Sequence, residues 1–382
     1  MIVRRVISGK RLHAFGDCIG DVPVLHTHLA KYQAEVCDSL GIQLRDINAE
    51  EVAQSQSHRI LEFDESLLFS KGFLKAILRW IEKEKPKNHV QFGIKNQESL
   101  QRFSLPINNQ ETPRVFPIFY KIPGATHTEI VELCGREFEM KLRVPPQIVP
   151  CGYYSTNMNE VFAAEIISPF HLLQANMGLN FNRTIALQKY LPRFLAAPLA
   201  EPFGKLATLG LKWTNRKGKN CKIHPSAVVE GCILGDNVVI GANAVVRLSV
   251  IGSDTHIGDA AVVNYSIVGK DNYVMTGNHL QFSLTYESVF TIHGPYQFSI
   301  FGRHSAVFAT INCDIRLDEK TISIPTANGI VDSKQHLLGI AYGHSSKVGA
   351  SNIIAAGRIV PNDTVLNPPD FIHLKFDTPN AE

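Results

Sequence analysis

Several features that are common in other classes of protein are missing from this 382-residue sequence. Its seven cysteines are odd in number and form no CxxC pair, which is typical of reduced thiols and excludes a regular disulfide framework. No uninterrupted apolar run approaches the length of a membrane span, and the N-terminus lacks the apolar core of a signal peptide. We therefore expect a cytoplasmic protein that is not attached to a membrane.

The chain also has little net charge, and several catalytic motifs are absent. A formal charge of +3 is too small to indicate a nucleic acid or an acidic membrane as partner. The sequence contains no Walker loop, no zinc-ligand spacing and no recognisable Ser-His-Asp arrangement. What is present is the composition of a globular protein, 45% apolar and 19% charged, at a length that suits two domains.

A 17-residue repeat organises the stretch from Ile223 to Leu280. Its apolar residues recur in steps of five or six, so that three registers each return after 17 residues. One register holds Val229, Val246, Val263 and Leu280. Glycine, asparagine and aspartate follow many of the aliphatic positions, and these residues tolerate the positive φ of tight corners. The repeat predicts a triangular coil of parallel strands with aliphatic side chains stacked inside.

The repeat resembles the hexapeptide-repeat, left-handed β-helix family, which contains acyltransferases and the C-terminal domains of sugar nucleotidyltransferases. This resemblance implies the left hand of the coil and a homotrimer packed through it. The apolar rhythm is lost after Leu280 through about Gln297, returns weakly from Phe301, and resumes in six-residue steps from Tyr342 to Leu366. Residues 314–338 do not fit a coil and alternate before a turn, which predicts a hairpin arm projecting from the prism.

The N-terminal half has the order of a βαβ unit. A strand at 2–7 precedes a glycine-bearing loop at 14–21, a helix from about Thr27 to Leu40 and a strand at 42–47. This order predicts a parallel sheet. Residues 90–150 are strand-like but irregular, as in an antiparallel insertion or an extension of the sheet.

Roughly residues 2–200 resemble sugar-1-phosphate nucleotidyltransferases in the order of their elements. That family begins with a strand and a glycine-rich loop that holds the nucleoside triphosphate, followed by a Lys-Pro pair and a helix. The resemblance assigns nucleotide binding here to Gly16, Asp17, Gly20 and Pro23. Val22 stands where the family has lysine, and the loop lacks arginine. Because such cations neutralise phosphate charge, their absence indicates reduced or lost activity.

Asp64 ends the apolar strand Ile60–Asp64, where the same family has an aspartate that holds Mg²⁺. Carboxylate oxygen is a suitable ligand for that ion, and open parallel sheets bind ligands at the carboxyl ends of their strands. The other interpretation is an aspartate that caps the following turn. A second metal carboxylate is expected late in the domain, at Glu160 or Glu165.

The coil suggests a second chemistry. Hexapeptide acyltransferases bind acetyl-CoA or another acyl-CoA between neighbouring prisms and use a histidine as general base, a role that suits a pKa near neutrality. His304 and His344 lie on coils that border the arm and are the candidate catalytic residues, although corner histidines are often only solvated.

The predicted fold class is therefore α/β plus all-β, a nucleotidyltransferase-like, Rossmann-like mixed sheet followed by a left-handed parallel β-helix. The boundaries are 1–182 for the first domain, 183–220 for a helical linker, 221–370 for the coil with its arm, and 371–382 for a tail. Three functions stay open: a nucleotidyltransferase that uses Mg²⁺ on a nucleotide and a sugar phosphate, an acyl-CoA-dependent acyltransferase, and a binding protein that has lost activity.

Overall fold

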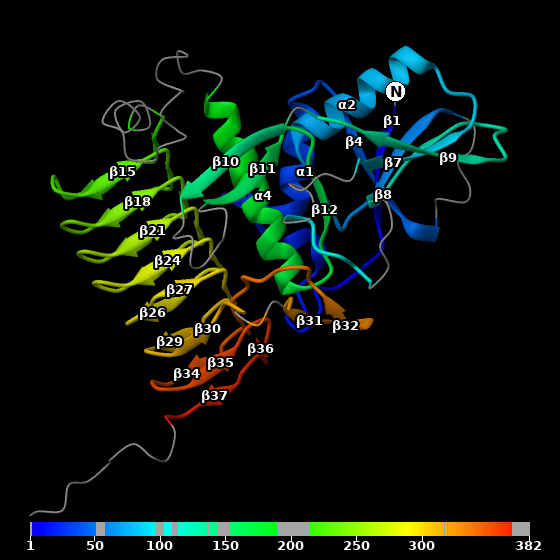
Figure 1. Cartoon of the computed structure of the whole chain (residues 1–382). Coiled ribbons are helices and arrows are strands. Elements are labelled where there is room, and N and C mark those ends of the chain that lie inside the picture. The colour runs from blue at the N-terminus through cyan, green and yellow to red at the C-terminus, as the bar shows by residue number, and fades with distance from the viewer. Residues whose placement is uncertain are drawn as a thin grey trace, which may run out of the picture.

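The computed structural model describes residues 2–50, 58–95, 103–108, 114–135, 137–143, 153–188, 212, 214–316, 318 and 320–368. A mixed α/β domain lies beside a stack of short parallel strands, consistent with a left-handed β-helix (Figure 1). The predicted fold class is confirmed. The predicted linker at 183–220 lies largely outside the described residues, and the tail at 371–382 lies wholly outside them.

The first domain is built on a six-stranded mixed sheet in the order β4-β1-β5-β8-β7-β9. Its strands are β1 (Ile2–Ile7), β4 (Leu44–Asn48), β5 (Ile60–Asp64), β7 (His89–Ile94), β8 (Arg114–Lys121) and β9 (Thr128–Leu133). β1 pairs in parallel with both β4 and β5, and β8 runs antiparallel to β5 and β7. The carboxyl ends of β1, β4 and β5 therefore share one edge of the sheet.

Within the described ranges, the α-helices beside this sheet include α1 (Leu29–Asp38), α2 (Lys71–Glu84) and α4 (Pro169–Gln188). α2 begins at Ser70, whose side chain accepts a hydrogen bond from the Phe73 N–H, and it ends at Lys85 in the left-handed conformation. Smaller elements are the 3-10 turn η1 (Ile19–Asp21) and three antiparallel pairs: β2 (Pro23–Val24) with β3 (Thr27–His28), β6 (Leu67–Phe69) with β12 (Ala163–Glu165), and β10 (Glu137–Arg143) with β11 (Tyr153–Asn159).

The coil has three sides. The first holds β13 (Arg216–Lys217), β16 (Ile233–Leu234), β19 (Val250–Ile251), β22 (Ile267–Val268), β25 (Leu284–Thr285), β28 (Ile300–Phe301), β33 (Ala341–Tyr342) and β36 (Ile359–Val360). The second holds β14 (Lys222–Ile223), β17 (Val239–Ile240), β20 (His256–Ile257), β23 (Tyr273–Val274), β26 (Phe290–Ile292), β29 (Ala306–Phe308), β34 (Lys347–Val348) and β37 (Val365–Leu366). The third holds β15 (Val228–Glu230), β18 (Val245–Arg247), β21 (Val262–Asn264), β24 (His279–Gln281) and β27 (Tyr296–Gln297), with the separate pair β30 (Ile311–Cys313) and β35 (Ile353–Ala355).

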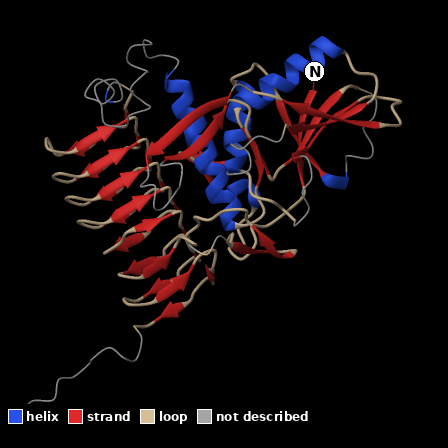
Figure 2. Ribbon diagram, in the orientation of Figure 1, coloured by secondary structure: helices blue, strands red, loops and turns tan. Residues whose placement is uncertain are grey.

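The strands of the first side bury residues in two different cores. Alternation along a strand points neighbouring side chains to opposite faces. Ile251 and Val268 face inward and belong to the core of the coil. Val250 and Ile267, one residue earlier, face outward and join the core of the α/β domain. α4 lies between the sheet and the coil (Figure 2), and its Asn180 side chain donates to the Leu248 carbonyl at 2.8 Å.

The apolar repeat is interrupted after Leu280 because the type of residue at the inward positions changes, whereas the coil itself continues. β25, β26 and β27 fill this stretch, with buried Thr285, Thr291 and Tyr296 at positions that elsewhere hold aliphatic residues. One residue is also missing from this turn, since Leu280 pairs with Tyr296 after 16 residues (296 − 280 = 16). An apolar pattern therefore cannot detect this coil.

The hairpin within residues 314–338 consists of β31 (Ser323–Thr326) and β32 (Gly329–Asp332). It does not stand free of the molecule, because Ile322, Ile324 and Leu338 are buried in the same core cluster as the outward residues of the first side. The arm therefore extends the cover that the α/β domain provides. Within the described residues, no helix combines the length and apolar character that crossing a membrane requires.

Close stacking of the coils makes some glycines sterically necessary. A Cβ on Gly252 would lie 2.5 Å from backbone atoms of Gly269 and Lys270 in the next coil. Gly252→Ala should therefore lower the free energy of unfolding by about 2 kcal/mol through overpacking, measured by urea denaturation. Gly41→Ala is the comparison, because that position has a positive φ and empty space, and it should cost about 1 kcal/mol. Equal losses in both variants would contradict the steric explanation.

Candidate functional site

Polar side chains gather where β1 and β5 end. Asp64 is the last residue of β5, and its Oδ2 lies 3.0 Å from Lys10 Nζ. Its Oδ1 accepts hydrogen bonds from the backbone N–H and hydroxyl of Ser66, at 2.9 and 2.6 Å. Glu165, at the end of β12, reaches the same ammonium at 3.9 Å. Asp64 and Glu165 thus approach one lysine from two strands.

The segment that carries Lys10 is fixed by the neighbouring carboxylate of Glu65. Its Oε1 accepts from the Ser8 N–H at 2.8 Å, the Ser8 hydroxyl at 2.9 Å and the Lys10 N–H at 3.3 Å. Gly9 between them has φ 69°, a left-handed conformation that glycine adopts without strain. Glu65 is buried, so this turn is held firmly at the carboxyl end of β1.

The charges in this cluster favour a cation. Burial raises the pKa of Glu165, the nearby Asp64 charge raises it further, and Lys10 opposes both effects. Two partly buried carboxylates share the Lys10 ammonium, which leaves surplus negative charge. In the described part of the chain, no three His, Cys, Asp or Glu side chains converge as a metal site. A metal here would take two protein carboxylates and its other ligands from water or from a bound phosphate.

The predicted nucleotide-loop residue Asp17 lies elsewhere, against the coil. Its Oδ2 accepts from His344 Nε2 at 2.8 Å and from the Tyr286 hydroxyl at 3.1 Å, and its Oδ1 accepts from Arg303 Nη2 at 2.5 Å. Phe15 packs against both His344 and Tyr286, with ring centroids 4.8 and 5.9 Å apart. The loop is therefore docked on the coil by buried polar contacts.

These contacts determine the tautomer of His344. The Arg303 backbone N–H donates to its Nδ1 at 2.9 Å, so Nδ1 carries no proton in the neutral ring. Nε2 then carries the proton that is donated to Asp17. Both ring nitrogens are engaged, and the one lone pair of the neutral ring, on Nδ1, already accepts the Arg303 N–H, so His344 has no free lone pair with which to accept a proton from an acceptor substrate.

Burial would raise the pKa of Asp17, but the hydrogen bond and electrostatic interaction with His344, and then those with Arg303, outweigh it and hold that pKa below its ordinary value. Asp17 is thus an anion that serves the interface. His304 is exposed on a corner with φ 58°, and it does not take part in this network.

The other predicted loop residues occupy structural positions. The Gly16 carbonyl accepts from Arg11, and the Gly20 carbonyl lies 3.2 Å from His28 Nδ1. The Pro23 carbonyl accepts from Asn176 of α4 at 2.9 Å. Their roles in binding a nucleotide, and the catalytic roles of His304 and His344, stay predictions.

The sequence interpretation missed the cations that follow β1. It placed the phosphate loop at residues 14–21, whereas Lys10 and Arg11 come directly after the first strand and its Ser8-Gly9 turn. The position of these cations at the end of a predicted parallel strand was a usable signal. Of the two candidate second carboxylates, Glu165 joins Asp64, whereas the Glu160 backbone carbonyl accepts from Ser70 at the start of α2.

Comparison with known proteins identifies one part of the coil. Residues 218–247 match the sequence model of the family described as bacterial transferase hexapeptide (six repeats). A search of curated proteins found no match to the chain. The match supports a transferase-type hexapeptide coil, and it leaves the nucleotidyltransferase resemblance of residues 2–200 as a prediction.

Proposed function

We propose that the protein is a sugar-1-phosphate nucleotidyltransferase-like protein that binds a nucleoside triphosphate or nucleotide sugar at the carboxyl ends of β1 and β5. The observation that carries the proposal is the meeting of Asp64 and Glu165 around Lys10. These residues come from three separate segments, and they meet at the edge where parallel strands bind ligands. The hexapeptide match agrees, because sugar nucleotidyltransferases include members with such coils.

Asp64 and Glu165 would hold Mg²⁺, because both are carboxylates at one partly buried place. Burial, together with the smaller effect of the Asp64 charge, raises the pKa of Glu165, and a divalent ion would stabilise the charged form of this carboxylate. The ion would neutralise negative charge on the phosphates of a bound nucleotide. Lys10 is nearly half exposed, so its side chain is free to turn from the carboxylates toward a phosphate. Lys10 and Arg11 thereby supply the kind of charge that Val22 lacks.

The test is Mg²⁺-dependent binding of nucleoside triphosphates, measured by calorimetry with ATP, GTP, CTP, UTP and dTTP. We expect at least one triphosphate to bind in the presence of Mg²⁺, and Asp64→Asn or Glu165→Gln to weaken it at least tenfold, about 1.4 kcal/mol. Asp38→Asn, an exposed carboxylate on α1, is the matched control and should bind as the wild type does.

Turnover then separates an enzyme from a binding protein. The triphosphate that binds is incubated with each of a panel of sugar 1-phosphates, and the release of pyrophosphate is measured. Release by the wild type that is lost in Asp64→Asn would establish nucleotidyltransferase activity. Tight nucleotide-sugar binding without release would indicate the inactive binding protein. The absence of any Mg²⁺-dependent nucleotide binding, or equal binding by the wild type and Asp64→Asn, would overturn the proposal.

The acyltransferase alternative is favoured less by the geometry. It requires a histidine that can accept a proton, and both ring nitrogens of His344 are already bonded. Acetyl-CoA binding that is lost in His304→Ala would support it.

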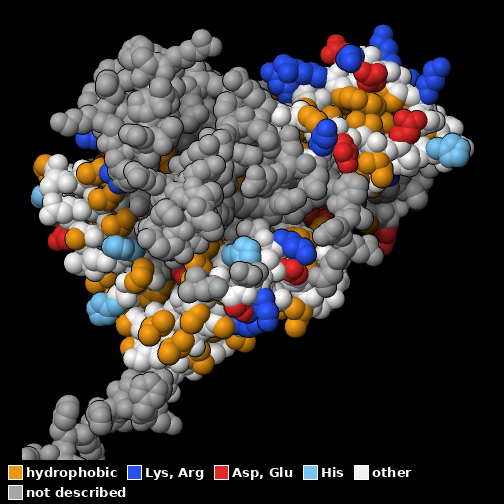
Figure 3. Space-filling model, in the orientation of Figure 1, with side chains coloured by type: hydrophobic (Ala, Val, Ile, Leu, Met, Phe, Trp, Pro, Cys, Tyr) orange, Lys and Arg blue, Asp and Glu red, His pale blue; other side chains and the backbone are white. Residues whose placement is uncertain are grey.

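Assembly into a trimer through the coil belongs to the same proposal, since hexapeptide-repeat transferases commonly form trimers. The sides that the α/β domain leaves open carry large apolar side chains, among them Tyr273 on the second side and Ile311 and Ile353 on the third. Figure 3 shows hydrophobic side chains over the lower coils. Ile353 is 68% exposed in the single chain, which is consistent with a surface that another copy covers.

A further inference from the structure

A polar cavity lies at the opposite end of β5 from Asp64. Its volume is about 320 Å³, and it is formed by the start of β5, the start of β7 and the turn that follows β8. The lining residues are His58, Ile60, Glu62, His89, Lys121, Ile122, Pro123, Gly124, Ala125 and Thr126. Ile60 and Asp64 are the two ends of β5, about 13 Å apart in an extended strand, so this cavity and the Asp64 cluster are different places.

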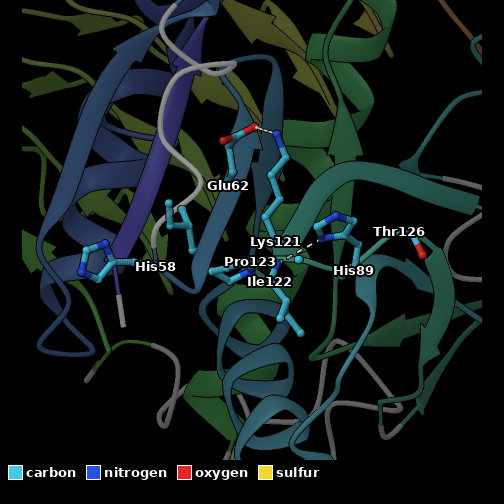
Figure 4. Close-up of a pocket in the computed structure, with 10 residues that line it drawn as sticks. His58, Glu62, His89, Lys121, Ile122, Pro123 and Thr126 are labelled. Carbon is cyan, nitrogen blue, oxygen red and sulfur yellow. Dashed lines mark hydrogen bonds and ion pairs between the residues drawn. The ribbon is translucent and has the colours of Figure 1, made fainter.

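The cavity lining contains both hydrogen-bond donors and acceptors. Lys121 extends toward Glu62 (Figure 4), with Nζ 2.7 Å from Oε1, and Glu62 is only 6% exposed. The ammonium has two further N–H groups, and the carboxylate has a second oxygen. The pair balances its own charge, so the cavity has no surplus that would favour a charged ligand.

His89 adds a donor of defined identity. The Ile122 backbone N–H donates to His89 Nδ1 at 3.1 Å, so Nδ1 carries no proton in the neutral ring and Nε2 does. Among the described residues, none forms a hydrogen bond with Nε2. The Thr126 hydroxyl, which can donate or accept, lies on the same side of the cavity in Figure 4.

We propose that this cavity binds a neutral polyhydroxylated compound of monosaccharide size. A hydroxyl group both accepts and donates, so neighbouring hydroxyls on one ring can accept from Lys121 and His89 while donating to Glu62. Because Glu62 and Lys121 cancel each other's charge, neither an anion nor a cation gains a net attraction that would offset the hydration it loses in the cavity. The volume is near the lower end of the range for small-molecule sites, about 300–1,000 Å³, which suits one ring. The proposal does not depend on nucleotide binding at Asp64.

The test uses neutral sugars and their charged counterparts on the full-length chain. Saturation-transfer NMR and calorimetry with glucose, mannose, N-acetylglucosamine and myo-inositol are compared with glucose 1-phosphate and glucuronate. We expect at least one neutral probe to bind more tightly than its charged counterpart. Its Kd should be below about 10 mM, which is the affinity that a few hydrogen bonds provide. Binding should persist in Asp64→Asn, which separates this site from the proposed nucleotide site.

Two variants locate the binding. His89→Asn keeps an acceptor for the Ile122 N–H but removes the Nε2 donor, and it should weaken binding at least tenfold. Glu62→Gln/Lys121→Met removes both charges together, so that neither is left buried alone, and should abolish binding. Glu132→Gln, which changes an exposed carboxylate on β9, is the control.

If no neutral probe binds at 20 mM, about twice the expected Kd limit, or if a charged counterpart binds more tightly, the proposal is overturned. Binding that survives in the double variant also overturns it, and the double variant decides the question if His89→Asn fails to fold.

Discussion

Replacing Asp17 with asparagine is expected to lower the free energy of unfolding by about 3 kcal/mol at pH 7, the lower end of the range for breaking a buried ion pair. Tyr286, His344 and Arg303 all donate to the Asp17 carboxylate. An amide places an NH₂ group against at least one donor and leaves Arg303 without this counter-charge. The lower end is appropriate because Arg303 is one-third exposed and can reach water.

The pH dependence provides an independent check. The folded pKa of Asp17 is below its ordinary value of 3.8, so its contribution is present above about pH 4 and is lost as the pH falls through the lower, folded value. The difference between wild type and Asp17→Asn should therefore be constant from pH 5 to 7 and should shrink below pH 4. Urea denaturation at several pH values measures it.

Glu287→Gln is the control for Asp17→Asn. Glu287 also pairs with Arg303, at 3.0 Å, but both side chains are about one-third exposed, so its loss should cost less than about 1 kcal/mol. A loss at Asp17 no larger than the loss at Glu287 would contradict the role assigned to the buried carboxylate.

Phe301→Ala should lower the free energy of unfolding by about 4 kcal/mol, because it removes a buried ring from the centre of the coil. Phe301 is 0% exposed and lies between Tyr342 and Tyr296, with ring centroids 5.0 and 5.5 Å away. These rings occupy the coils on which the arm is inserted, so a cavity there would loosen the base of the arm as well as the stack.

Phe308→Ala makes the same chemical change on the outside of the coil. Phe308 on β29 is 37% exposed, and its ring centroid lies 5.7 Å from that of Phe290. Removing this ring should therefore lower the free energy of unfolding by only about 1 kcal/mol. Urea denaturation of both variants, followed by far-UV circular dichroism, gives the comparison. Similar losses in the two would mean that Phe301 is not the packed centre that the structure shows.

The parts of the fold that repeat could be predicted, because a repeat tests its own pattern several times. Val229, Val246, Val263 and Leu280 fall in one column, as their 17-residue spacing requires. The same method failed at Thr285, Thr291 and Tyr296, where buried polar and aromatic side chains fill inward positions. Backbone pairing with the neighbouring coils fixes these positions, and a hydrophobic pattern contains no information about it.

The candidate site was only partly predictable, for a related reason. Asp64 could be found because it ends an apolar strand, and its position is local. The pairing of Asp17 with His344 joins residues 327 apart, and nothing near either residue indicates the other. The same applies to Glu62 and Lys121, which meet because β8 lies antiparallel to β5.

The outward row of the first side has a consequence for how such a chain can arise and be divided. Val250, Ile267, Leu284 and Ile300 are interior residues only while the α/β half is present. Each half therefore covers apolar side chains of the other half, and neither half could be moved to another protein without exposing them. If recombination exchanged one half, the replacement would also need an apolar surface that matches this row of side chains. We therefore expect the sequences of the two halves to change together during evolution.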